Sequence, residues 1–103
     1  QKGGFHKAMI FILKKMRNKK NRTATFVCSL SFKHPKKKII TVEGKIRGII
    51  STKILGQNGF GYDPIFKPHF SNLTFGQMSK LKKIKLDHRF IAFKKLKKKV
   101  RTL

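Results

Sequence analysis

Two long stretches of alternating residues, separated by a His-Pro pair at 34–35, constrain this chain more than any other feature. Residues 22–32, RTATFVCSLSF, alternate Thr-, Val- and Ser-type positions with Phe and Leu, which is typical of a β-strand. Residues 37–50, KKIITVEGKIRGII, predict one or two further strands. Gly44 and Gly48 within them indicate a turn, a bulge or a bend. The sequence therefore predicts two or three antiparallel strands ahead of the loop that follows.

A helical pattern precedes these strands. Apolar residues recur there three and four positions apart, which predicts an amphipathic helix over residues 5–17 that ends near Lys19: Phe5, Ala8, Met9, Ile12, Leu13 and Met16. The apolar run is too short for a membrane span, and no signal-peptide cleavage pattern follows it.

Shorter elements are predicted after the strands. Residues 65–66 indicate a short strand that stops at Pro68. Residues 74–77 have the T-x-x-Q form of a capping box, so we expect a short helix to start there. Asp87 is a strong N-cap residue, which predicts a last helix beginning at His88, with one apolar face formed by Ala92, Phe93, Leu96 and Val100. A chain of 103 residues can bury one modest core.

The charge of the chain is extreme. Its 27 Lys and Arg residues against 3 Asp and Glu give a net charge of +24, which is typical of nucleic-acid-binding proteins. However, 22 of these cations are lysine, whereas base and phosphate recognition usually uses the bidentate fork of arginine. A nucleotide bias in the coding DNA would give the same composition, and the lysine runs at 36–38 and 94–99 also suit solvated surfaces. A small lysine-rich nucleic-acid-binding protein stays open as an alternative.

The single cysteine, Cys28, excludes an internal disulfide framework and a cysteine-based metal site. It is compatible with a reducing compartment. We therefore expect a cytoplasmic protein.

Residues 56–66, GQNGFGYDPIF, differ from the rest of the chain because they contain no positive charge. Three glycines there permit positive φ angles and close approach of the backbone to a ligand: Gly56, Gly59 and Gly61. These features indicate a candidate base-binding loop. A glycine-rich turn whose aromatic side chains fill the core is the alternative.

The side chains of this loop have separate expected roles. Phe60 and Tyr62 flank a glycine, so one ring can face a planar ligand while the other anchors the loop. Asp63 directly precedes Pro64, which favours an extended conformation and leaves its carboxylate free to accept hydrogen bonds.

A second group of polar residues lies at the start of the last predicted helix. His88 and Arg89 would occupy its first turn, where their donors add to free backbone N–H groups. Lys83 lies five residues before His88, close enough to reach the same pocket from the preceding loop. A solvated helix end is the alternative interpretation.

Taken in order, these pieces resemble the C-terminal half of the inosine triphosphate pyrophosphatase family, which removes noncanonical purine nucleotides. The resemblance rests on G-F-G-Y-D-P-I-F in the loop, T-F-x-x-M at 74–78, Lys83 and the His-Arg pair, and covers roughly residues 22–97. It implies an α/β fold in which a mixed β-sheet has flanking helices, here the C-terminal lobe of a two-lobed structure. Residues 1–103 would then be a single partial domain.

The resemblance implies hydrolysis of ITP, dITP or XTP to the monophosphate and pyrophosphate, with magnesium and usually by a homodimer. It implies substrate binding by seven residues: Phe60, Gly61, Tyr62, Asp63, Lys83, His88 and Arg89. An aromatic ring would stack on the purine, while the basic side chains donate to its 6-keto oxygen. The 6-amino group of adenine would place donor against donor, and unpaired buried polar groups reject the wrong base.

The chain departs from the family pattern at three places near this site. Asp87 replaces a serine, which keeps the helix cap but adds negative charge. Gln77 replaces a glutamate and preserves the capping box. Ile54 and Leu55 replace a Pro-Arg pair, which removes one nearby positive charge.

The resemblance also indicates what these residues lack. In the family, the N-terminal half contributes a T-x-N-x-x-K phosphate loop and acidic residues that hold magnesium and activate water. The acidic residues here are Glu43, Asp63 and Asp87, outside any such motif. We therefore expect no catalytic residue and no metal ligand in this chain. Because it begins at Gln1, we expect a piece of a longer protein that alone binds nucleotide weakly and does not hydrolyse ITP.

Overall fold

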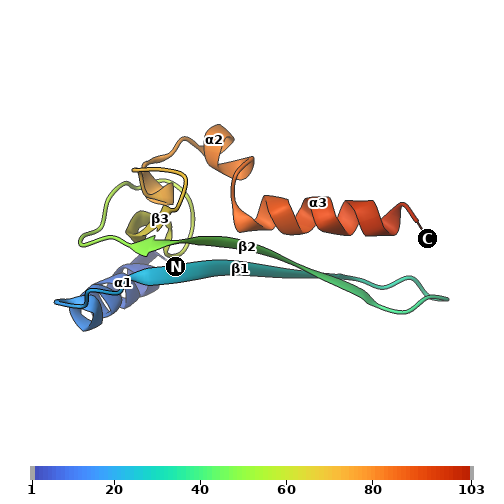
Figure 1. The fold of residues 1–103 in the computed structure, drawn as a ribbon, viewed down its shortest axis with the longest axis horizontal. Coiled ribbons are helices and arrows are strands. Elements are labelled where there is room, and N and C mark those ends of the chain that lie inside the picture. The colour runs from blue at the N-terminus through green and yellow to red at the C-terminus, as the bar shows by residue number, and fades with distance from the viewer. Residues whose placement is uncertain (1, 103) are drawn as a thin grey trace.

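A long two-stranded antiparallel ribbon, extended at one end by a third short strand, forms the centre of the protein (Figure 1). The computed structural model describes residues 2–102. Its elements are α1 (Lys2–Met16), β1 (Thr23–Phe32), β2 (Ile40–Ile50), β3 (Phe66–Pro68), α2 (Lys80–Ile84) and α3 (His88–Val100), with 3₁₀ turns η1 (Asp63–Ile65) and η2 (Phe75–Gln77). The α/β class with flanking helices is confirmed, and each strand pair in the sheet is antiparallel.

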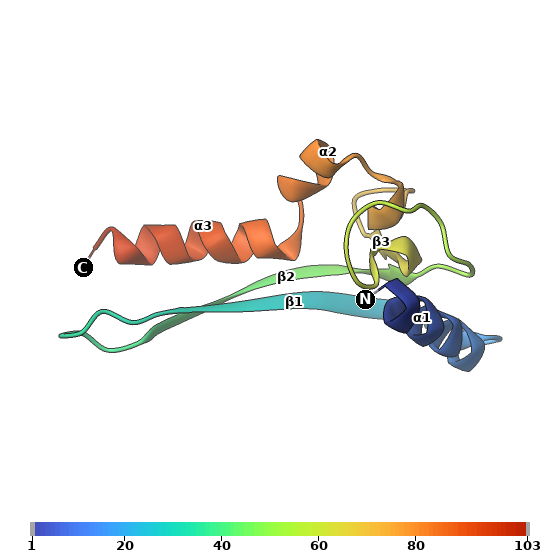
Figure 2. The ribbon, with the colours of Figure 1, turned by 180° about the vertical axis from the view of Figure 1, so that it is seen from behind.

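The alternating pattern predicted the ribbon correctly. β1 pairs with β2 from Thr23 opposite Ile49 to Phe32 opposite Ile40. Even-numbered residues of both strands face inward, and α3 lies along this face in both views (Figures 1 and 2). Odd-numbered residues of both strands are exposed on the other face.

The two glycines of β2 do not form a turn, a bulge or a bend, so that prediction is wrong. β2 is one continuous strand, and both residues lie on its buried face. A Cβ atom on Gly44 would collide with the backbone of α3 at His88 and Ala92. A Cβ atom on Gly48 would collide with the carbonyl of Lys67 in β3. The glycines are therefore positions of close backbone approach.

The hydrophobic core lies where β3 joins the ribbon. Phe66 and Phe75 are fully buried there, and Phe26 of β1 stacks on Phe66 with ring centroids 3.9 Å apart. Ile46 and Met78 complete the buried cluster. The loop that precedes β3 is thus fixed at its C-terminal end by packed aromatic rings.

The predicted N-terminal helix is confirmed as α1, which lies at the end of the sheet opposite the β1–β2 turn (Figure 2). Arg22 joins its C-terminus to the sheet, because the guanidinium donates to the carbonyls of Met16, Ile50 and Ser51 at 2.6–2.9 Å. Within residues 2–102, no helix has the length and apolar character needed to cross a membrane.

The later elements differ from the sequence predictions in detail. The capping box is present, but it opens only the single 3₁₀ turn η2, where Thr74 N–H donates to Gln77 Oε1 at 3.0 Å. α3 begins at His88 as predicted. Phe93 does not share the buried face of α3, since 54% of it is exposed while Ala92 is fully buried. α2 had no clear periodic signal in the sequence.

Candidate functional site

The glycine-rich loop has the backbone conformation that its composition predicts. Gly56, Gly59 and Gly61 have φ angles of 93°, 82° and 64°. Asp63 is not extended, contrary to the expectation from Pro64, because it is the first residue of the 3₁₀ turn η1. Ile65 N–H donates to the Tyr62 carbonyl at 3.0 Å and closes this turn.

The buried carboxylate of Asp63 holds the loop backbone in place. Only 2% of the residue is exposed, and its Oδ2 accepts a hydrogen bond from the Phe60 N–H at 2.7 Å. A Cβ atom on Gly59 would collide with this same oxygen. The positive φ and the missing side chain of Gly59 therefore both serve to bring the backbone over the carboxylate.

Lys83 links the loop to the start of α3. Its Nζ lies 2.9 Å from Asp63 Oδ2 and 3.2 Å from Asp87 Oδ2, and all three side chains are at least nine-tenths buried. Lys83 comes from the helix α2, not from a loop as expected. We call Asp63, Lys83 and Asp87 the ion triad; it joins three segments of the chain around one ammonium group.

Asp87 also caps α3. Its Oδ1 accepts a hydrogen bond from the Phe90 N–H at 2.9 Å, while its other oxygen contacts Lys83. One carboxylate thus satisfies a free helix N–H and neutralises a buried cation. The expected cap is confirmed, and the ion pair is the added consequence of aspartate at this position.

His88 is half-buried and lies against the sheet. Its ring meets Phe26 edge-on with centroids 5.0 Å apart, and its Nδ1 has no hydrogen-bond partner among the residues that the structure describes. Burial lowers the pKa of His88 below 6.5; the charge of Asp87 opposes this effect, and those of Arg89 and Lys83 add to it. A neutral imidazole offers one donor and one acceptor.

Two aromatic rings of the loop, those of Phe60 and Tyr62, lie at the surface. Phe60 is 59% exposed, with the Arg89 guanidinium carbon 5.4 Å from its ring centroid. Phe5 of α1 meets Phe60 and Tyr62 edge-on, at centroid distances of 5.2 and 5.4 Å. Because Tyr62 is also 37% exposed, the interpretation that the aromatic side chains fill the core is wrong for Phe60 and Tyr62. It is right for Phe66, the third aromatic residue of the stretch 56–66, which is fully buried.

The fold thus brings the predicted residues into one region. Phe60, Gly61, Tyr62 and Asp63 form the loop, Lys83 and Arg89 contact it, and His88 occupies the adjacent first turn of α3. The sequence did not predict that Phe5 contacts the loop, because an apolar residue at helical spacing indicates only that it lies on the buried face of a helix. The Lys83–Asp87 pair was also missed, although its four-residue spacing was a usable signal.

Comparison with known proteins gives a family for this arrangement. A profile described as the Ham1 family matches residues 1–99. The chain belongs to the Ham1 family. Its relatives include proteins named dITP/XTP pyrophosphatase from Clostridium tetani, 38% identical over 91 residues, and from Dictyoglomus thermophilum, 42% identical over 98 residues.

These alignments cover 88% and 91% of this chain but 45% and 47% of the relatives. The solved structure of the Staphylococcus aureus Ham1 protein is similar with a TM-score of 0.90 at 33% identity, over 95% of this chain and 51% of that one. The chain therefore spans about half the length of the Ham1 relatives it matches. The resemblance to the pyrophosphatase family and the fold class it implied are both confirmed.

The described residues do not fit a magnesium site. Two of the three carboxylates, on Asp63 and Asp87, already share the ammonium group of Lys83. The third, on Glu43, lies on the exposed sheet face 3.5 Å from Lys45 Nζ. Within residues 2–102, no three His, Cys, Asp or Glu side chains gather in a cluster that could hold a metal ion.

The lowered pKa of His88 predicts how stability varies with pH. The imidazole of His88 binds a proton more tightly in the unfolded chain than in the folded one. Neutral His88 therefore contributes stability that is fully present above about pH 6.5 and is lost as the pH falls below that value. We expect the free energy of unfolding to fall between about pH 8 and about pH 5.5, and to fall less in His88→Gln.

Urea denaturation across this pH range measures the effect. The control is His6→Gln, which changes an exposed histidine of α1 and should follow the unsubstituted protein. A pH dependence that is the same in His88→Gln and in the unsubstituted protein would contradict the assignment.

Proposed function

We propose that this chain carries the base-recognition part of a nucleoside triphosphate pyrophosphatase that hydrolyses ITP, dITP and XTP to the monophosphate and pyrophosphate. Its Ham1 relatives named dITP/XTP pyrophosphatase support this proposal. Residues 1–103 would be a single partial domain equivalent to the C-terminal half of such an enzyme, which agrees with the half coverage of those relatives.

The proposal rests mainly on the contact between the glycine-rich loop and residues 83–89, which lie about twenty residues later in the sequence. Arg89 lies over the exposed ring of Phe60, and Lys83 holds the carboxylate beneath the same loop. An exposed aromatic ring beside a planar cation is a suitable surface for a nucleobase, which can stack on both.

The donors around this surface favour a keto group over an amino group. The guanidinium of Arg89, which lies over the Phe60 ring, carries N–H donors in a fixed planar arrangement. The ammonium group of Lys83 is paired with two carboxylates, and the neutral imidazole of His88 has one N–H donor. The 6-keto oxygen of hypoxanthine or xanthine accepts from such groups, whereas the 6-amino group of adenine leaves donors unpaired.

Three further properties belong to the proposed whole enzyme and rest on the family resemblance. We propose a magnesium cofactor, a homodimer and a cytoplasmic location. Since the described residues do not fit the metal, its ligands would come from a part of the enzyme outside them. When bound, magnesium would stabilise the charge of the triphosphate.

Binding of ITP and ATP to the purified chain tests the base-recognition role by isothermal titration calorimetry. We expect weak binding with ITP preferred over ATP. Phe60→Ala should weaken ITP binding about tenfold, since stacking a base on an aromatic ring contributes about 1–3 kcal/mol. The matched control is Phe11→Ala, which removes a ring of α1 that is 60% exposed.

Equal affinity for the two nucleotides, or equal losses in the two variants, would count against the proposal. Magnesium-dependent release of pyrophosphate by this chain alone would contradict the placement of the catalytic groups outside it.

A further inference from the structure

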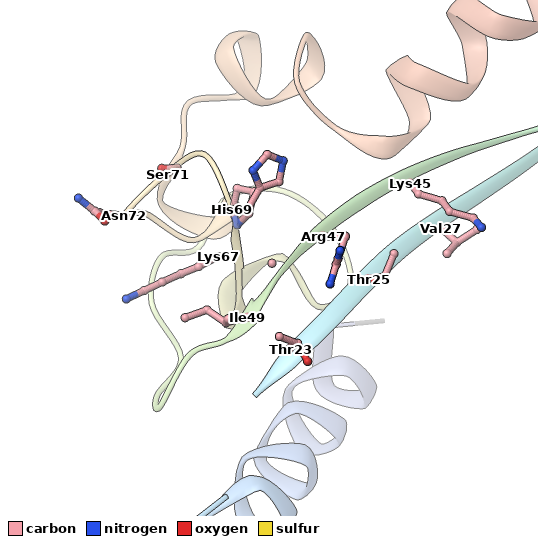
Figure 3. A pocket seen from close by; sticks show the side chains of 12 residues that line it. Thr23, Thr25, Val27, Lys45, Arg47, Ile49, Lys67, His69, Ser71 and Asn72 are labelled. Carbon is pink, nitrogen blue, oxygen red and sulfur yellow. The ribbon is translucent and has the colours of Figure 1, made fainter. Parts of the chain in front are cut away.

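The exposed face of the sheet carries a concave surface that does not include the candidate base-binding loop. Odd-numbered side chains of β1 and β2, together with β3 and the residues after it, line an open hollow of about 1160 Å³. Figure 3 shows Lys45 and Arg47 along β2, with Lys67 and His69 beside them. We call this surface the basic hollow.

The strand pairing fixes the order of these cations. Lys45 and Arg47 are two residues apart on one face of β2, a separation of about 6.8 Å along the strand. Lys67 lies on β3 opposite Ile49, the next residue of the same face. The His69 N–H donates to the Arg47 carbonyl at 2.9 Å, which holds the segment after β3 against β2.

Among residues 2–102, no carboxylate side chain lines the basic hollow. Asp63 and Asp87 are buried with Lys83 in the ion triad, and neither lines the hollow. Glu43 is the nearest acidic residue on this face, and its 3.5 Å contact with Lys45 is solvent-exposed, so it contributes little. The hollow therefore presents Lys45 and Arg47 on β2 and Lys67 on the neighbouring strand β3, and among the described residues Lys45 alone of the three contacts a carboxylate.

The positive charge of the basic hollow indicates which kind of partner can bind it. A second copy of the chain seated here about a two-fold axis would place the same cations against each other, which is unfavourable at a net charge of +24. A negatively charged partner, in contrast, would be attracted by the same cations. Thr25 adds a hydroxyl donor to the same surface, whereas the hydroxyl of Thr23 donates to Asn21 Oδ1 at 2.6 Å.

The lining also indicates which kind of anion fits. Its lining residues include no Phe, Tyr or Trp ring, which leaves the imidazole of His69 and the guanidinium of Arg47 as the surfaces on which an unpaired base could stack. A duplex keeps the faces of its bases stacked internally and presents its phosphates along the outside of the helix. We propose that the basic hollow binds the phosphodiester backbone of a nucleic-acid duplex, without reading its sequence.

Fluorescence anisotropy with a labelled DNA duplex of about 20 base pairs tests this proposal. Each lost phosphate contact lowers the slope of log affinity against log salt by about 0.9. The variant Lys45→Gln, Arg47→Gln, Lys67→Gln should therefore lower the slope by about 2 to 3 and weaken binding about 100-fold at about 0.15 M salt.

The matched control is Lys94→Gln, Lys97→Gln, Lys98→Gln, which removes the same charge from exposed positions of α3, on the opposite side of the sheet. Its slope should change by less than about 1. Equal losses in the two triple variants would overturn the proposal, because they would mean that the +24 charge attracts DNA diffusely.

Three further measurements test whether something other than a duplex binds the basic hollow. The single strand of the same sequence should bind more weakly than the duplex, and stronger binding would overturn the proposal. A dimer in analytical ultracentrifugation that only the hollow variant disrupts would assign this face to a second copy instead. Phe60→Ala should leave duplex binding unchanged, so this result is independent of base recognition by the loop.

Discussion

Replacing Lys83 with methionine will lower the free energy of unfolding by about 3–5 kcal/mol, the usual cost of removing one partner from a buried ion pair. The substitution keeps the length of the side chain but leaves Asp63 and Asp87 buried without their shared cation. The remaining carboxylates would also repel each other. Urea denaturation monitored by circular dichroism measures the loss.

The neighbouring residue provides the control. Lys82 lies on the same short helix but is exposed, so Lys82→Met should change stability by less than about 0.5 kcal/mol. If Lys83→Met were as stable as Lys82→Met, the ion triad would not hold the loop to α3. A compensating second change, Asp87→Ser, should recover part of the loss in Lys83→Met by removing one uncompensated charge.

Adding a single methyl group at Gly44 will destabilise the protein by about 3 kcal/mol, at the upper end of the range for overpacked cores. The new Cβ atom would collide with backbone atoms of His88 and Ala92, which cannot rotate away as a flexible side chain can. α3 would have to move from the sheet, carrying Arg89 away from Phe60. Thermal or urea unfolding of Gly44→Ala measures the cost.

A substitution one residue further along β2 separates this steric effect from a change in strand propensity. Lys45→Ala lies on the exposed face of the same strand and should change stability by less than about 0.5 kcal/mol. Similar stability of Gly44→Ala and Lys45→Ala would show that α3 tolerates displacement from β2.

The sequence predicted those features whose causes are local. Alternation of side chains gave the β1–β2 ribbon, and Asp87 gave the first residue of α3. The positive φ angles of the loop followed from its glycines. Each of these signals lies within a few residues of the structure that it specifies.

Features that depend on distant contacts were predicted incompletely or wrongly. Gly44 resembled a turn residue because the sequence cannot show that α3 crosses there. Phe93 fitted the helical period but faces solvent, since only Ala92 and its neighbours on that side meet the sheet. Asp63 and Lys83 are twenty residues apart, so only the family resemblance placed them in one site.

The ion triad has a consequence for the local dynamics of the site. Asp63 holds the Phe60 amide, Asp87 holds the Phe90 amide, and Lys83 holds both carboxylates. Breaking either ion pair leaves a buried charge, which is costly enough to favour release of all three groups at once. We therefore expect the loop and the first turn of α3 to unfold locally as a single cooperative unit, opening together and not one after the other.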